Sequence, residues 1–248
     1  MKCKGKKSLV SKYLDLSNLK DVFEIQKILI NNAECIIIDV GAHYGETIKK
    51  YREIFPNCTI FSFEPHIVSF NILNDKYYKD KKIYLNNIAI SNYVGISEFF
   101  CNYMDATNSL FPREKKGRRY FPQKASTKEI QKVQVCTLDN YCDNNSIDKI
   151  DILKMDIQGS ELSALQGAES LLKTNQISII YTEAFFIPHY AEAPLFHHIA
   201  AYLEKFDYTL YGIYNLKSGR NGQLRYGDMI FTGPEVRENI INNFPQEE

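Results

Sequence analysis

The chain has 248 residues, of which 44% are hydrophobic and 24% charged, so the fibrous and disordered classes are excluded and a globular protein is expected. Thirty Lys and Arg balance thirty Asp and Glu, and this neutral total argues against a protein dedicated to binding a nucleic-acid polymer. The sequence has no run of about 18 apolar residues, so we expect no membrane span.

The N-terminus begins with basic residues but reaches no apolar signal core, which predicts a cytoplasmic protein. The cysteines form no CxxC pair, and their scattered spacing favours reduced thiols over a disulfide framework. The six are Cys3, Cys35, Cys58, Cys101, Cys136 and Cys142. The oligomeric state stays open, with a homodimer as one alternative.

Helical and strand patterns alternate from the N-terminus onward. A helix is expected over residues 17–30 with Ser17 as its N-cap, followed by a β-branched strand over 35–40 that ends at Gly41. The pattern continues with a helix over 46–55, a strand over 58–63, a helix over 66–78 and a strand over 83–88. This alternation is typical of one half of a doubly wound α/β sheet.

The second half resumes the alternation after a less regular stretch. Strands are expected over 97–103 and 132–138, then a strand over 150–157, a helix over 160–172, a strand over 177–182, a helix over 194–206, and strands over 208–214 and 224–232. Because no helix separates the last two strands, they are predicted to form an antiparallel hairpin. We predict a helical extension over 1–34 and one domain over 35–235, with a basic insertion loop over 103–131.

The segment between the first strand and its helix is the strongest local signal for a ligand. Gly41 and Gly45 allow a tight turn and close approach of a ligand, and the helix behind them offers free N–H groups. His43 stands where a dinucleotide fingerprint would have its second glycine. Glu64 ends the second strand, about 20 residues further on, where a carboxylate accepts ribose hydroxyls. Together these residues predict a nucleotide-like cofactor.

Five segments resemble the FkbM family of class I methyltransferases, which use S-adenosylmethionine (SAM). They are DVGAHYGET at 39–47, FEP at 63–65, NNIAIS at 86–91, TLDNY at 137–141 and DILKMDIQGSELSALQGAESLL at 151–172. The resemblance runs from about Cys35 to Thr232, and LKMDIQGSE is its most specific part. The resemblance implies a Rossmann-like, seven-stranded doubly wound sheet of order 3-2-1-4-5-7-6 with the last strand antiparallel.

The resemblance also implies where SAM binds. The turn Gly41–Gly45 takes the methionine end, Glu64 the ribose hydroxyls, Asn87 and Ala89 the adenine, and Asp156 faces the sulfonium. The family more often has asparagine at His43, so the role of that side chain is open. The expected cofactor-binding set is Asp39, Gly41, Ala42, His43, Gly45, Thr47, Glu64, Pro65, Asn87, Ala89 and Asp156.

Three residues at the carboxyl ends of adjacent strands are candidates for catalysis: Asp156, Glu183 and His189. Methyl transfer to an alcohol needs a general base near the methyl group. The same side chains are also ligand types for a divalent metal that would lower the pKa of the hydroxyl. Base catalysis is favoured, and a metal site remains the alternative.

The acceptor is suggested by a local charge excess. Residues 113–124 carry six basic side chains and one acidic one, and paired arginines suit phosphate groups. Ser109, Arg118 and Arg119 are therefore predicted to bind the acceptor; the alternative is a solvated surface loop.

The predicted function is an SAM-dependent O-methyltransferase acting on a sugar hydroxyl. A nucleotide-linked or phosphorylated sugar is favoured, in surface-polysaccharide or secondary-metabolite modification. Two alternatives stay open: a non-catalytic adenosyl- or nucleotide-binding module, and a nicotinamide-dependent oxidoreductase. The missing G-x-G-x-x-G motif and the terminal hairpin argue against the second.

Overall fold

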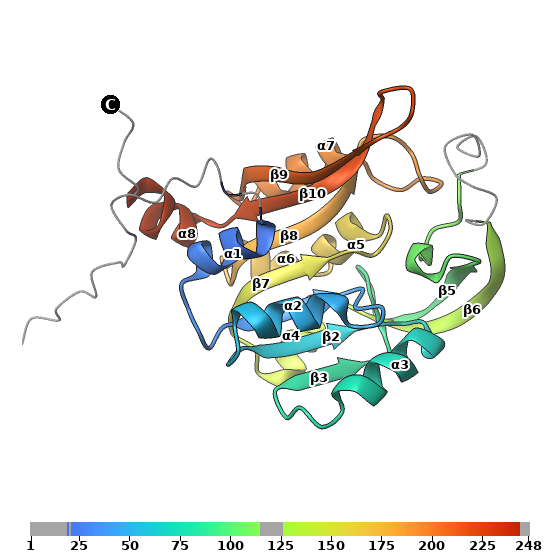
Figure 1. The fold of residues 1–248 in the computed structure, drawn as a ribbon, viewed down its shortest axis with the longest axis horizontal. Helices are drawn as coiled ribbons and strands as arrows, with labels where there is room; N and C mark the ends of the chain where they lie inside the picture. Colours follow the sequence, from blue (N-terminus) through green and yellow to red (C-terminus); the bar gives the residue numbers. More distant parts are fainter. Residues whose placement is uncertain (1–18, 20, 115–125, 244–248) are drawn as a thin grey trace, which may run out of the picture.

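A seven-stranded sheet forms the centre of the computed structural model, which describes residues 19, 21–114 and 126–243. Its order is β3-β2-β1-β7-β8-β10-β9 (Figure 1). The strands are β1 (Ile36–Val40), β2 (Thr59–Phe63), β3 (Ile83–Asn86), β7 (Ile150–Met155), β8 (Ile177–Phe185), β9 (Thr209–Ser218) and β10 (Leu224–Thr232). Of these seven strands, β10 alone runs in the direction opposite to the other six. This confirms the predicted strand order and the antiparallel hairpin.

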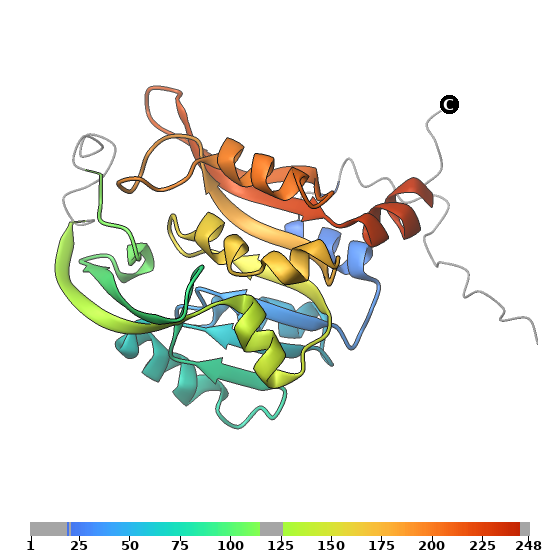
Figure 2. The same ribbon diagram turned by 180° about the vertical axis from the view of Figure 1, so that it is seen from behind.

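Helices cover both faces of this sheet, because neighbouring apolar residues of a strand point to opposite faces. Ile37 belongs to a core cluster with residues of α1, α2, α3 and α8, whereas Ile38 belongs to a second cluster with residues of α4 to α7. The first set is in front in Figure 1 and the second in Figure 2. The helices are α1 (Val22–Ile30), α2 (Glu46–Ile54), α3 (Ile67–Tyr77), α4 (Leu138–Asn145), α5 (Glu161–Gln166), α6 (Glu169–Lys173), α7 (Phe196–Glu204) and α8 (Pro234–Asn239). None of these described helices is long and apolar enough to cross a membrane.

A second, three-stranded sheet lies at the end of the molecule toward which β2 and β7 point (Figure 1). It consists of β4 (Ala89–Ile90), β6 (Thr127–Cys136) and β5 (Gly95–Asn102), with β5 and β6 as a long antiparallel hairpin. The prediction of a loop over 103–131 was wrong at its end, because β6 begins inside that range. Strand β6 begins before the apolar residues that predicted it, because its first residues pair with β5.

The helix predicted over 160–172 is broken into α5 and α6 at Gly167. A Cβ atom on Gly167 would lie 2.0 Å from the carbonyl oxygen of Ser91, so this point of the chain is pressed against the loop after β4. The carboxylate of Asp139 accepts two N–H groups in the first turn of α6, at 2.9 and 3.1 Å. The break is therefore set by packing and is capped from another helix.

The first helix starts later than predicted. Its N-cap is Asp21, whose carboxylate accepts the N–H of Phe23 at 2.9 Å. Ser17, the expected cap, lies outside the described residues. The helix contributes Val22 and Leu29 to the core, so it is packed against the sheet.

Candidate functional site

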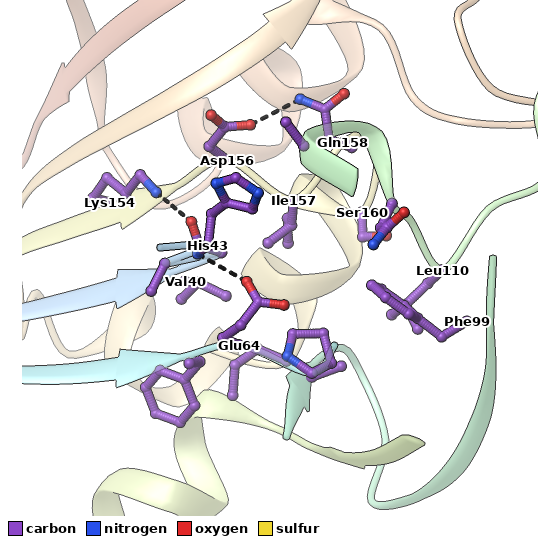
Figure 3. A pocket seen from close by; sticks show the side chains of 18 of the residues that line it. Val40, His43, Glu64, Phe99, Leu110, Lys154, Asp156, Ile157, Gln158 and Ser160 are labelled. Carbon is purple, nitrogen blue, oxygen red and sulfur yellow. Dashed lines mark hydrogen bonds between the residues drawn. The ribbon is translucent and has the colours of Figure 1, made fainter. Parts of the chain in front are cut away.

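A cavity lies at the carboxyl ends of β1, β2 and β7, where the strand order reverses (Figure 3). Open α/β sheets bind ligands at this position. Its walls are formed by the turn after β1, the end of β2, β4 and the loop after β7. Strand β5 and the segment that follows it, with the short 3₁₀ turn over Asp105–Thr107, complete them.

The turn after β1 requires both of its glycines. Gly41 has φ +81°, and a Cβ atom there would lie 2.0 Å from the carbonyl oxygen of Asp156. Gly45 has φ +84°, and its Cβ would lie 2.4 Å from the ring of Tyr77. The cavity is lined from this segment by Gly41, Ala42, His43 and Thr47. Only glycine permits this turn to pack so closely on its neighbours.

A buried ion pair lies next to the turn after β1 and is hydrogen-bonded to its backbone. The Nζ atom of Lys154 lies 2.8 Å from Asp39 Oδ1 and donates a 2.8 Å hydrogen bond to the carbonyl of Gly41. Burial lowers the pKa of Lys154, but Asp39, Asp156 and Glu64 outweigh it and raise the pKa overall. Lys154 lines the cavity, whereas Asp39 lies behind it with no exposed surface.

Lys154 was missed by the sequence reasoning. The signal that would have found it is a charged residue in β7, all of whose residues are buried. Such a side chain needs a partner, since an unpaired charge is costly to bury.

Glu64 connects the ends of β1 and β2. One of its carboxylate oxygens accepts the N–H of His43 and the other the N–H of His66, both at 2.8 Å. Burial raises the pKa of Glu64, and these two N–H bonds oppose the shift. Glu64 lines the cavity together with Pro65, and Figure 3 shows the Glu64 side chain there.

Of the two residues expected beside the adenine, one lines the cavity and the other does not. Ala89 lines the cavity together with the apolar side chains of Phe63, Ile90 and Phe99. Asn87 does not line it; its Nδ2 donates to the carbonyls of Glu64 and Pro65, at 2.8 and 3.0 Å. Asn87 therefore acts on the site through the backbone that carries Glu64.

Gln158 joins two of the three candidate catalytic residues. Its Nε2 donates to Asp156 Oδ1 at 2.9 Å and to Glu183 Oε2 at 2.7 Å, and its Oε1 accepts the hydroxyl of Tyr190 at 2.7 Å. Asp156 lines the cavity and Glu183 lies behind it within β8. Burial, then Asp156, raises the pKa of Glu183 well above its ordinary range. Gln158 thus connects the carboxyl group that lines the cavity to a buried one behind it.

A buried carboxyl group holds the loop after β7. Glu161 accepts the N–H groups of Ile157 at 3.0 Å and Gly159 at 2.9 Å. Burial raises the pKa of Glu161 to about 7. Sequence reasoning did not single out this residue, because an acidic residue in the first turn of a helix is ordinary.

His189 and Ser109 lie outside the cavity wall. His189 is 3% exposed and stacks on Phe185 with ring centroids 4.4 Å apart. Burial, together with Arg113 and Arg225, lowers the pKa of His189 to about 3. The Ser109 hydroxyl donates to the backbone carbonyl of Gln158 at 2.7 Å, so it positions the loop after β7.

The three candidate catalytic residues do not gather as metal ligands. Within the described ranges, the group of His, Cys, Asp or Glu side chains whose ligand atoms lie within 4.8 Å of one another is a different one, discussed below. Arg118 and Arg119, predicted to bind the acceptor, lie outside the described residues.

The cavity is closed on one side by a contact between the glycine turn and the hairpin. Tyr44 donates its hydroxyl to Asp105 Oδ2, and His43 Nε2 lies 3.4 Å from Asp105 Oδ1. The hydrogen bond to Asp105 raises the pKa of Tyr44 to about 12. His43, which has φ +49°, thus takes part in the contact between the turn after β1 and the 3₁₀ turn over Asp105–Thr107.

Comparison with known proteins gives a consistent assignment. The family model of the methyltransferase FkbM domain matches residues 39–210. The 2-O-methyltransferase NoeI of Sinorhizobium fredii is 25% identical over 163 residues, covering 62% of this chain and 65% of NoeI. A crystal structure of methyltransferase FkbM from Methylobacillus flagellatus KT superposes with a TM-score of 0.52 at 16% identity, covering 79% of this chain and 44% of that one. This structural likeness supports the fold, and the chain spans slightly under two thirds of NoeI.

Proposed function

The chain belongs to the FkbM methyltransferase family, and on this premise we propose that it is an SAM-dependent O-methyltransferase acting on a sugar hydroxyl. The observation that carries the proposal is the convergence of the Gly41–Gly45 turn, Glu64 and Lys154 on one cavity at the strand-order reversal. The similarity to NoeI, a 2-O-methyltransferase, supports oxygen as the methylated atom.

The donor set of the cavity suits each part of SAM. Glu64 offers carboxylate oxygens to the ribose hydroxyls, and the buried ammonium of Lys154 suits the methionine carboxylate. Phe63, Ala89 and Phe99 offer an apolar surface to the adenine ring. The carboxylate of Asp156 favours the positive end of the cofactor.

Asp156 is our proposed general base. When bound, SAM supplies the methyl group from its sulfonium. The Asp156 carboxylate takes the proton of the acceptor hydroxyl as the new C–O bond forms. Gln158 Nε2 donates to this carboxylate and to Glu183, whose pKa is raised by burial and by Asp156. His189 is the weaker candidate, because it does not line the cavity.

The acceptor class is proposed from charge. The basic segment 113–124 favours an anionic acceptor, and we propose a nucleotide-linked or phosphorylated sugar. For the compartment we propose the cytoplasm, supported by the free thiols of the five described cysteines.

The test begins with mass spectrometry of the purified protein for retained SAM or its demethylated product, followed by calorimetric titration with SAM. Incubation with a library of sugars and nucleotide-sugars should then yield a product heavier by one methyl group. SAM binding without transfer to any acceptor would favour an adenosyl-binding module. Binding of a nicotinamide cofactor in place of SAM would favour an oxidoreductase and overturn the proposal.

A further inference from the structure

A second cluster of chemically active side chains lies on the outer wall of the cavity. It consists of His66, Cys101 and Glu129, whose ligand atoms all lie within 4.8 Å of one another. They come from three elements: the residue before α3, strand β5 and strand β6. None of the three lines the cofactor cavity, so the roles proposed above do not account for them.

Strand pairing brings two of these residues together. Cys101 and Glu129 are directly opposite in the antiparallel hairpin β5–β6, so their side chains share one face. Phe99 is two residues before Cys101 and lies on the same face, where it lines the cavity. His66 approaches this face from the segment that begins with Glu64. The cluster therefore joins the hairpin to the end of β2.

A neighbouring hydroxyl group contacts the histidine ring. Its Nδ1 lies 2.9 Å from the hydroxyl of Ser69, which is 1% exposed. In the tautomer in which Nδ1–H donates to this hydroxyl, Nε2 is the nitrogen that can bind a metal. In metal sites the second ring nitrogen is held by such an outer partner, which sets the ring orientation.

We propose that His66, Cys101 and Glu129 bind one zinc ion, with water as the fourth ligand. Thiolate, imidazole and carboxylate together suit Zn²⁺, whereas Mg²⁺ and Ca²⁺ prefer oxygen ligands throughout. On binding, the Cys101 thiol releases its proton to solvent and a sulfur–zinc bond forms, with no change of oxidation state. The ion fastens the hairpin to the start of α3 and so fixes the cavity wall that carries Phe99. The site does not depend on methyl transfer.

The direct test uses the full chain after removal of metal with EDTA under reducing conditions. Zn²⁺ is titrated in competition with a chromophoric chelator, and Co²⁺ serves as a spectroscopic probe. We expect one Zn²⁺ per chain, and a Co²⁺ complex with a thiolate-to-metal charge-transfer band and the strong visible bands of tetrahedral geometry. No tight zinc binding, or a Co²⁺ spectrum without the thiolate band, would overturn the proposal.

Variants locate the ion. Cys101→Ser should abolish the thiolate band, and Glu129→Gln, at an exposed position, should weaken zinc binding by at least about tenfold. Ser69→Ala should weaken it by about tenfold through loss of ring orientation. The matched controls are Cys136→Ser and Glu98→Gln, which remove the same groups elsewhere on the hairpin and should leave zinc affinity unchanged. Equal zinc affinity in Glu129→Gln and Glu98→Gln would place the metal elsewhere and refute the site.

Discussion

Gln158 is the residue whose conformation is most informative about catalysis. Its backbone has φ +56°, a left-handed conformation that residues other than glycine rarely adopt. Tyr190 and Ser109 hold it there, through its side chain and its backbone carbonyl respectively. Gln158 is strained, is held by hydrogen bonds at its side chain and its backbone, and donates to the carboxyl groups of Asp156 and Glu183. Such strain is typical of functional sites.

Asp156→Asn should lower turnover by about two orders of magnitude or more, because the amide cannot take the acceptor proton. Asparagine keeps an oxygen that accepts the Gln158 amide, so the loop should retain its conformation. The measurement is the rate of methyl transfer under saturating SAM, with calorimetry showing cofactor affinity within severalfold of wild type. Near-normal turnover would transfer the role of base to Glu183 or His189.

Glu64→Ala should weaken SAM binding at least tenfold. Hydrogen bonds to a charged group contribute roughly 1.5–3 kcal/mol each, and the ribose hydroxyls would lose theirs. The carboxylate also accepts the N–H groups of His43 and His66, so the alanine variant loosens the turn as well. Glu64→Gln, which keeps the size and one acceptor oxygen, should be milder. A dissociation constant unchanged in both variants would mean that the ribose binds elsewhere.

Glu161 should make the protein less stable as pH rises. Its pKa is raised from 4.5 to about 7 in the folded chain, so between these values the unfolded chain releases a proton that the folded chain keeps. Stability from this group is complete below the unfolded value and falls by about 3 kcal/mol as pH rises through the folded value. Urea unfolding at pH 5 and pH 8 should show a smaller loss in Glu161→Gln than in wild type; the variant keeps the part that comes from other buried carboxyl groups with raised pKa, such as Glu64 and Glu183. Equal pH dependence in the two proteins would contradict the assignment.

The break between α5 and α6 illustrates how packing overrides helix propensity. The apolar spacing over 160–172 suits one continuous helix, yet Gly167 meets the loop after β4 and Asp139 caps a new start. The short α6 thereby turns Leu171 and Leu172 into the core on that face of the sheet.

Gly167→Ala should destabilise the protein by about 1–3 kcal/mol, although alanine is the better helix former. The added Cβ atom would meet the backbone oxygen of Ser91 at 2.0 Å, and a backbone atom yields only if the loop moves. The control is Gln166→Ala, at the exposed preceding position, where a change within about 0.5 kcal/mol is expected. Thermal or urea unfolding measures both, and equal effects would show that the contact with Ser91 is easily relieved.

Charge is distributed unevenly over a chain that is neutral in total. Of the basic segment 113–124, the described Arg113 packs over the ring of Tyr190, 4.2 Å from its centroid, and thus belongs to the folded body. The remaining basic residues lie outside the described ranges, and their role is proposed from sequence alone.

Changing Arg118 and Arg119 together to Ala should raise the KM of the acceptor severalfold while leaving SAM affinity unaltered. Added salt should raise the wild-type KM too, because screening weakens exposed charge contacts. Steady-state kinetics at two ionic strengths and calorimetry with SAM provide the measurements. A KM insensitive to both changes would indicate an uncharged acceptor.

The sequence by itself determined the strand–helix alternation and the functional turn. Apolar β-branched runs specify buried strands, and the glycines at 41 and 45 specify a turn that few other residues permit. Glu64 and Asp156 were found because they directly follow strands, and the carboxyl ends of parallel strands meet at one edge. The resemblance supplied the strand order, which local patterns leave open.

Tertiary structure decided which side chains meet. Lys154 lies under the turn after β1, Gln158 joins Asp156 to Glu183, and His66 faces β5 and β6 only because distant segments pack together. His189 follows a strand as Asp156 does, yet it stacks on Phe185 away from the cavity. The physical reason is that periodicity records which face a residue occupies, whereas side-chain direction and pairing depend on contacts between elements far apart in the chain.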